Sequence, residues 1–111
     1  PSGYLDDAEL ARALTAPLRE RSKASHSQTR RKLMERKLPE VEIEAALSEL
    51  DAEDEVALVR EAALQRVGRM RDLDRVTAER RLLGFLARRG WSGESARSAV
   101  NEALESVGLR R

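Results

Sequence analysis

The chain has 111 residues, enough for one compact domain or a short array of repeated units but too few for two large domains. Hydrophobic residues make up 41% and charged residues 37%, which excludes a disordered chain and indicates a surface crowded with charge. The absence of cysteine excludes disulfides, thiolate metal sites and cysteine nucleophiles. The net charge is only +1, which by itself predicts indifference to polyanions.

Three helices are predicted in the first half of the chain. Asp6 is the expected N-cap of the first helix, and an apolar contact between Leu5 and Leu10 would support this start. Pro17 interrupts this helix, either as a kink or as the first residue of a second short helix. The second helix carries Leu33 and runs to about residue 37.

The third helix opens with Pro39 at its first helical position. Its apolar residues recur at helical spacing and predict one buried side; they are Ile43, Ala46, Leu47 and Leu50. Glutamates cover much of the remaining surface of this helix.

Three further helices are predicted in the second half. Asp51 should cap the fourth helix, which runs to about residue 70. Its apolar positions are Val56, Val59, Ala63 and Val67. Thr77 should start the fifth helix and Gly90 should end it, and Ser92 should cap the sixth, which runs to about residue 104 or 107.

The two halves repeat the same plan. A shift of 53 positions superimposes Leu33 on Leu86, Leu38 on Trp91, Ala46 on Ala99 and Leu47 on Val100. Strand signals are missing, since alternation at period two is not sustained. We therefore predict an all-α fold, an elongated, right-handed tandem array of two three-helix repeats that cover residues 1–50 and 51–111.

Two stretches of the sequence resemble the RecX family of bacterial recombination regulators. YLDDAELA at residues 4–11 is similar to the family's repeat-opening motif, with an aromatic and an aliphatic residue before an acidic pair. FLARRGWS at residues 85–92 is similar to the turn in the family's last repeat. The resemblance spans nearly the whole chain and implies that residues 1–50 and 51–111 are the second and third of three repeats. The sequence departs from the family pattern at Ser25-His26, where Gly-Pro is usual, and at Lys37, where Gly is usual.

The resemblance also implies a function. Such proteins bind the RecA recombinase and its filament on single-stranded DNA, and usually limit filament growth or strand exchange. The resemblance implies that the repeat array lies in the filament groove, and it implies no catalytic residue. We expect a monomer without a cofactor or metal. Direct contact with DNA is left open.

Charge along the chain is segregated by sign. Residues 19–37 hold eight Lys or Arg against two Glu, residues 40–55 hold eight acids and no base, and residues 60–90 hold nine Arg against four acids. Segregated charge can present basic stripes to polyanions. The candidate contacts with the filament or with DNA phosphate are Arg19, Arg21, Lys23, Arg30, Arg31, Lys32, Arg36, Lys37, Arg80, Arg81, Arg88 and Arg89. A solvated basic face and arginine stems packed on the core are the competing interpretations.

Other chemically distinctive residues favour structural roles. Phe85 and Trp91 could stack on bases, but core packing is favoured, because Trp91 follows Gly90 at a helix turn and repeats the role of Leu38. His26, the only histidine, is expected to be a loop or capping residue. The acidic run at residues 40–55 is expected to be solvated or to pair with the neighbouring basic helix rather than to bind a metal.

We therefore expect a cytoplasmic regulator of DNA repair and recombination that acts by binding rather than by catalysis. No apolar run approaches the roughly 18 residues that a membrane span needs. Two alternatives remain, which are a general DNA-binding helical module and a helical scaffold for another protein.

Overall fold

A computed structural model of the chain describes residues 6–50 and 52–109, and this part of the chain is helical without strands. The helices are α1 (Asp7–Glu20), α2 (His26–Glu35), α3 (Glu40–Ser48), α4 (Ala52–Val67), α5 (Arg75–Arg88) and α6 (Gly93–Ser106), and a 3-10 turn, η1 (Gly68–Met70), follows α4. The predicted all-α fold is confirmed. None of the described helices is long and apolar enough to cross a membrane.

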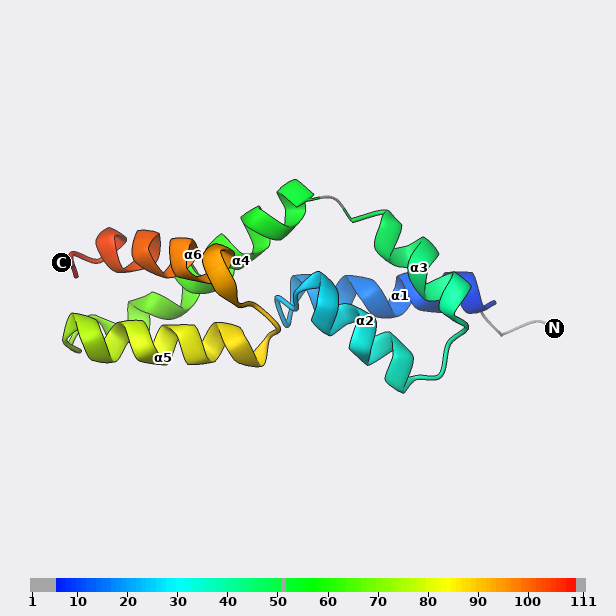
Figure 1. Ribbon diagram of the computed structural model, residues 1–111, viewed down its shortest axis with the longest axis horizontal. Coiled ribbons are helices and arrows are strands. Elements are labelled where there is room, and N and C mark those ends of the chain that lie inside the picture. The colour runs from blue at the N-terminus through cyan, green and yellow to red at the C-terminus, as the bar shows by residue number, and fades with distance from the viewer. Residues whose placement is uncertain (1–5, 51, 110–111) are drawn as a thin grey trace.

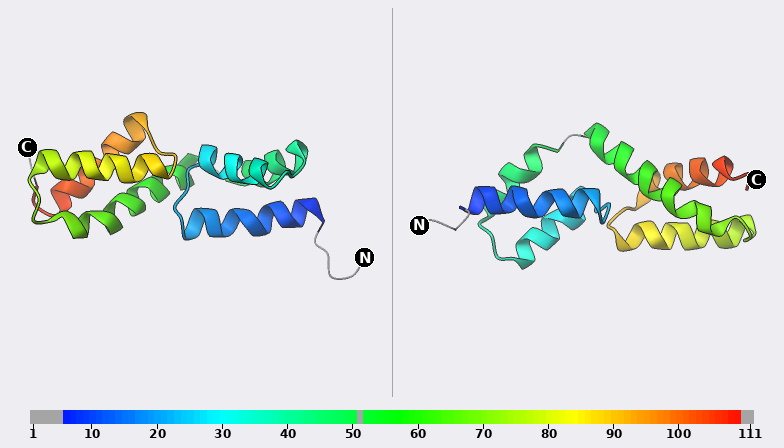
Figure 2. Two further views of the ribbon diagram at one scale, coloured as in Figure 1. Left: turned by 90° about the horizontal axis from the view of Figure 1, so that it is seen from below. Right: turned by 180° about the vertical axis from the view of Figure 1, so that it is seen from behind.

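The helices pack as two groups of three along one axis. The described molecule measures 57 × 23 × 19 Å, and the predicted elongated shape is therefore confirmed. We call α1–α3 the first unit and α4–α6 the second unit; they lie end to end in Figure 1 and in both views of Figure 2. The right-handed twist of the array stays a prediction, as does the domain boundary between residues 50 and 51.

Side-chain caps start several helices. The Asp6 carboxylate accepts a hydrogen bond from the Glu9 N–H at 2.7 Å, as predicted for the first helix. In the second unit the Asp74 carboxylate accepts from the Thr77 N–H at 2.7 Å, and this bond lowers the pKa of Asp74. Helix α5 therefore begins at Arg75, two residues before the predicted start, because the cap lies three residues before the amide that it satisfies.

The positions of two prolines relative to the helices of the first unit differ from those predicted. Helix α1 continues through Pro17 to its end, so this residue does not open a separate short helix. Pro39 is the N-cap of α3 rather than its first helical residue, and the helix begins at Glu40. The predicted contact of Leu5 and the predicted cap at Asp51 lie outside the described residues.

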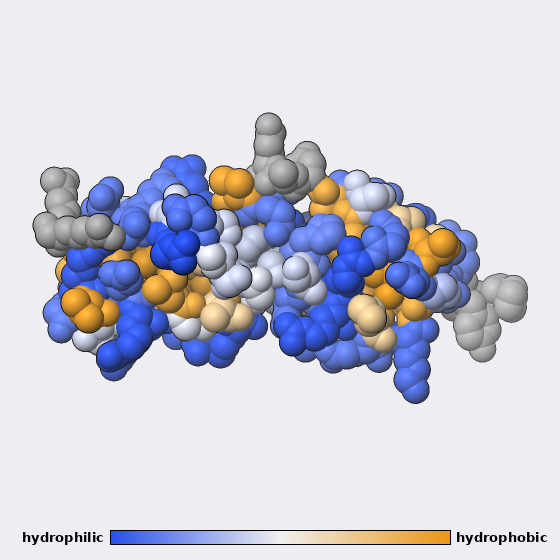
Figure 3. Space-filling view, in the orientation of Figure 1, coloured by the Kyte–Doolittle hydropathy of each residue, from blue (hydrophilic) through white to orange (hydrophobic). Residues whose placement is uncertain are grey.

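Each unit has its own apolar cluster. In the first unit Leu33, Ile43 and Leu47 are buried, and Leu14, Leu38 and Leu50 pack around them. The second unit has a larger cluster, which includes Val59, Ala63, Val67, Met70, Leu82, Leu86, Trp91, Val100 and Leu104. Val56 is 62% exposed, which contradicts its predicted place on the apolar side of α4. Figure 3 shows apolar side chains in small, separate patches on one face of the molecule.

The two units meet at a small contact made mostly of polar groups. This contact, which we call the joint, consists of residues 19 and 23–26 of the first unit and residues 55, 61 and 89–91 of the second. The Trp91 indole N–H donates to the Lys23 carbonyl oxygen at 2.7 Å. The Ser25 N–H donates to the Arg89 carbonyl oxygen at 2.9 Å. Trp91 is buried as predicted, and its N–H also links the two units.

The Glu55 carboxylate lies at the centre of the joint. It forms an ion pair with Arg19 and accepts from the His26 N–H at 3.0 and 3.2 Å through its two oxygens. Arg19 is only 7% exposed, and it also donates to the Ala24 carbonyl oxygen at 2.9 Å. A buried guanidinium needs such partners, because an unpaired buried charge is strongly destabilising.

Gly90 allows the units to approach closely. Its φ of +88° lies in the left-handed region that favours glycine. A Cβ atom at this position would overlap Ser25 Oγ and lie 2.7 Å from Gln28 Cβ. The turn between α5 and α6 therefore fits against the start of α2 only without a side chain.

Candidate polyanion-binding groove

Helix α5 carries a basic flank beside its buried side. Leu82 and Leu86 are fully buried, which fixes the rotation of the helix against the core. The flank beside this buried side carries Arg81, Phe85 and Arg88. These residues are four and three positions apart and therefore lie on the same flank of the helix. Because of this rotation the flank faces the open side between α5 and α4.

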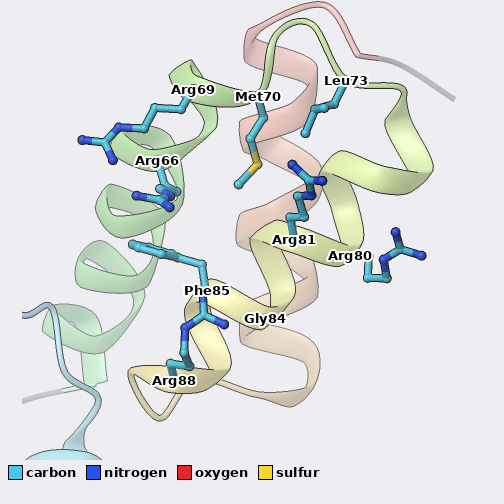
Figure 4. Close-up of a pocket in the computed structure, with 9 residues that line it drawn as sticks. All are labelled: Arg66, Arg69, Met70, Leu73, Arg80, Arg81, Gly84, Phe85 and Arg88. Carbon is cyan, nitrogen blue, oxygen red and sulfur yellow. The ribbon is translucent and has the colours of Figure 1, made fainter.

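The open side between α4 and α5 is a groove of ≈ 400 Å³. Its lining residues are Arg66, Arg69, Met70, Leu73, Arg80, Arg81, Gly84, Phe85 and Arg88, and Figure 4 shows them. A second hollow of ≈ 200 Å³ shares three of these residues and extends the groove across the joint, where Arg21, Lys23 and Arg89 line it. We call both hollows together the cationic groove. No acidic residue is among the described residues that line either hollow.

Phe85 is the platform on which arginines of the groove are arranged. In Figure 4 its ring points from α5 toward α4 and lies against Arg66. The Arg66 and Arg89 guanidinium carbons lie 4.9 and 3.9 Å from the ring centroid, within the range of cation–π attraction.

Like charges crowd the groove. Burial lowers the pKa of Arg89 below its usual value, and the neighbouring charges of Arg66 and Arg88 lower it further. Arg66 Nε is buried without a hydrogen-bond partner in the described part of the chain. An anion placed in the groove would reduce the repulsion between the arginines and could accept bonds from them.

The groove gathers half of the predicted contact residues. The predicted residues that line it are Arg21, Lys23, Arg80, Arg81, Arg88 and Arg89. Sequence reasoning missed Arg66 and Arg69, which come from α4 and the following turn. Their spacing of three residues beside the buried Val67 was the available signal, because it places two arginines on one flank of α4 and the turn that continues it.

The other predicted contact residues do not come together in the groove. Arg19 is enclosed in the joint, and we therefore remove it from the contact set. On the first unit, Arg30 forms an ion pair with Glu44 of α3, and Arg31 donates to the Gln28 side chain at 2.6 Å. The pair between Arg30 and Glu44 shows that the acidic run is in part bound to the basic helix before it. Lys32, Arg36 and Lys37 are exposed on α2 and the turn after it.

Comparison with known proteins finds similarity to one family. A family model described as the third three-helix domain of RecX matches residues 53–100. A protein named regulatory protein RecX from Amycolatopsis mediterranei (strain U-32) is 31% identical over 107 residues, which make up 96% of this chain and 61% of that protein. Another protein of that name, from Streptomyces coelicolor, is 41% identical over 66 residues, which make up 60% of this chain and 35% of that protein.

The comparison with solved structures found no match. The chain spans 61% of the length of the first of these relatives and aligns with 35% of the second. The matched domain lies within the second unit, and it includes most of the residues that line the cationic groove. Residues 53–100 thus match the third three-helix domain of RecX, and nearly the whole chain is similar to a protein named regulatory protein RecX.

Proposed function

We propose that the chain binds the RecA recombinase and its filament on single-stranded DNA in the cytoplasm, and that it limits filament growth and strand exchange. Similarity to the RecX family supports this proposal, and the relatives are named regulatory proteins. The chain would act as a monomer by binding rather than by catalysis. The first unit would correspond to the second repeat of the family, in front of the third repeat that the family model matches.

The cationic groove is the observation that carries the proposal. Its basic side chains come from both units, so a binding partner must present negative charge to both sides of the joint. A nucleoprotein filament offers such a surface, since its DNA carries one phosphate per nucleotide. The elongated molecule would contact successive protomers while the groove faces acidic groups of the assembly.

Filament growth on single-stranded DNA tests the proposal. Recombinase assembly would be followed by fluorescence with the chain added at substoichiometric amounts. We expect slower or shorter growth, and a smaller effect as salt rises, because screening weakens contacts between charged surfaces. Unchanged growth at low salt would contradict the proposed function.

A general DNA-binding module is the second candidate, because a groove lined by arginines, with no acidic residue among its described lining residues, also suits the phosphates of bare DNA. Binding to single-stranded DNA with and without recombinase separates the two functions. The filament function predicts tighter binding to the complex than to DNA alone. The second candidate predicts that recombinase adds nothing.

A further inference from the structure

The relative orientation of the two units depends on few contacts. The helix pairs in extensive contact all belong to the same unit, and the buried apolar clusters of the two units are separate. The described contacts across the joint are mainly hydrogen bonds and the ion pairs of Glu55 and Glu61. Salt-sensitive polar contacts of this kind hold two domains together less firmly than a shared apolar core does.

The cationic groove crosses this joint. Arg21 and Lys23 line it from the first unit, and Arg66, Arg69 and Arg89 line it from the second. These groups carry the same sign, so they repel one another across the joint when the groove is empty. The ion pair between Lys23 and Glu61, at 3.0 Å, offsets part of this repulsion.

Two residues take part in both the joint and the groove. The main-chain oxygen of Arg89 accepts a hydrogen bond from the Ser25 N–H, and the side chain of Arg89 stacks on Phe85 in the groove. The main-chain oxygen of Lys23 accepts the hydrogen bond of Trp91, and its side chain lines the groove. Opening of the joint would therefore move the basic groups of the first unit away from those of the second.

We propose that a phosphate chain bound in the cationic groove bridges the two units and fixes their relative orientation. Binding and joint closure are then reciprocal: a bound phosphate chain favours the closed joint by the same factor by which closure favours binding. A change that opens the joint must therefore weaken binding. Planar guanidinium groups suit a phosphate chain because each can donate two parallel hydrogen bonds to one phosphate. This inference rests on the proposed function in one respect only, which is that the DNA of the filament would be the natural source of the phosphate chain.

A pair of glycine variants tests this coupling without changing charge. Gly90→Ala inserts a methyl group into the joint, whereas Gly108→Ala introduces the same kind of strain, at φ +83°, with no atom within 4 Å. Affinity would be measured by fluorescence anisotropy with labelled oligothymidylate and by competition with linear inorganic polyphosphate. We expect Gly90→Ala to weaken binding of both probes by about fivefold or more, the lower range of measured coupling. Equal affinity in the two variants would overturn the proposal.

A second pair of variants separates simple charge attraction from coupling to the joint, because the two predict opposite changes in affinity. Glu55→Gln removes a negative charge from the joint, and Glu102→Gln removes one from an exposed ion pair with Arg60 within the second unit. Coulomb attraction alone predicts that either change tightens binding of a polyanion. Coupling predicts that Glu55→Gln weakens it while Glu102→Gln does not. Tighter or equal binding by Glu55→Gln would contradict the coupling.

Distance measurement provides a test that needs no joint variant. The chain has no cysteine, so Ala45→Cys in α3 and Ser98→Cys in α6 provide two unique positions for spin labels, both exposed and outside the groove. We expect polyphosphate to narrow the distribution of distances between the labels. An unchanged distribution at saturating probe, or no binding of either phosphate probe, would overturn the proposal.

The probes also separate this inference from the proposed function. Polyglutamate serves as a carboxylate chain of the same sign, and tighter binding of polyglutamate than of both phosphate probes would overturn the choice of phosphate. None of these experiments contains recombinase. Coupling without an effect on recombinase filaments would therefore contradict only the proposed function, and the reverse result would contradict only the coupling.

Discussion

The two units share one plan of three helices but differ in their interiors. The first unit encloses a cluster of three large apolar residues, whereas the second encloses a larger cluster from all of its helices. Leu33 and Leu86 occupy equivalent positions in the repeat, and both are fully buried. Since burial of apolar area is the main stabilising contribution, the second unit should be the more stable of the two.

The outer surfaces of the equivalent helices α2 and α5 differ even more. A shift of 53 positions places Gln28, Lys32 and Glu35 of α2 where α5 has Arg81, Phe85 and Arg88. The first unit thus lacks the aromatic platform and has an acid in place of one arginine. The repeated positions set the fold, and the positions that differ between the repeats form the cationic groove.

Truncation of equivalent core leucines should have the largest effect. Leu33→Ala and Leu86→Ala each remove a fully buried side chain and should cost about 2 to 5 kcal/mol of unfolding free energy. In Leu33→Ala we expect the first unit to unfold while the second stays folded, because its cluster is separate. Hydrogen exchange resolved along the chain would show faster exchange in α1–α3 alone. Equal loss of protection in both units would mean that the joint makes the molecule cooperative.

Loss of the aromatic platform should have a smaller effect. Phe85→Leu removes two cation–π contacts that are worth roughly 0.5 to 1 kcal/mol each at exposed sites, and it should weaken binding to oligothymidylate several-fold. Phe85→Tyr keeps the ring and should bind nearly as well as the unchanged chain. If both variants bind equally poorly, the ring does not act as the platform.

Relief of strain at Lys37 should have the smallest effect. This residue has φ +58° at the position equivalent to Gly90, which a non-glycine residue adopts only with strain. Lys37→Gly should stabilise the first unit by about 0.5 to 1 kcal/mol, because strain relief of roughly 1 to 2 kcal/mol exceeds the entropy cost of glycine. Urea unfolding measures this gain. Affinity for oligothymidylate should stay unchanged, since Lys37 is not among the residues that line the groove.

Local patterns were sufficient to predict the helices and their repeat. Asp6 caps α1, and Ile43, Ala46 and Leu47 form the buried side of α3. The exposure of Val56 could not be predicted from its chemistry, because the buried residues in the described part of α4 begin only at Val59. Such an effect depends on how far the neighbouring helices extend along α4. The spacing of apolar residues within one helix does not reveal this.

The site was predictable only in part, because it depends on contacts between distant segments. The basic flank of α5 follows from its own spacing, and Arg80, Arg81 and Arg88 do line the groove. The pairing of Arg19 with Glu55 joins residues 36 positions apart and could not be read from either helix. Phe85 packs against the core as predicted, but it is only partly buried, and Arg66 and Arg89 lie over its ring.

The most direct measurement compares two variants that each lose three positive charges. One variant changes Arg66, Arg81 and Arg88 of the cationic groove to Gln, and the other changes Arg31, Lys32 and Arg36 of the first unit to Gln. Binding to the recombinase filament would be measured at several salt concentrations. We expect the groove variant to lose about tenfold or more in affinity with a flatter salt dependence, and the first-unit variant to bind almost normally. Equal weakening of both, or greater weakening of the first-unit variant, would contradict the assignment of binding to the groove.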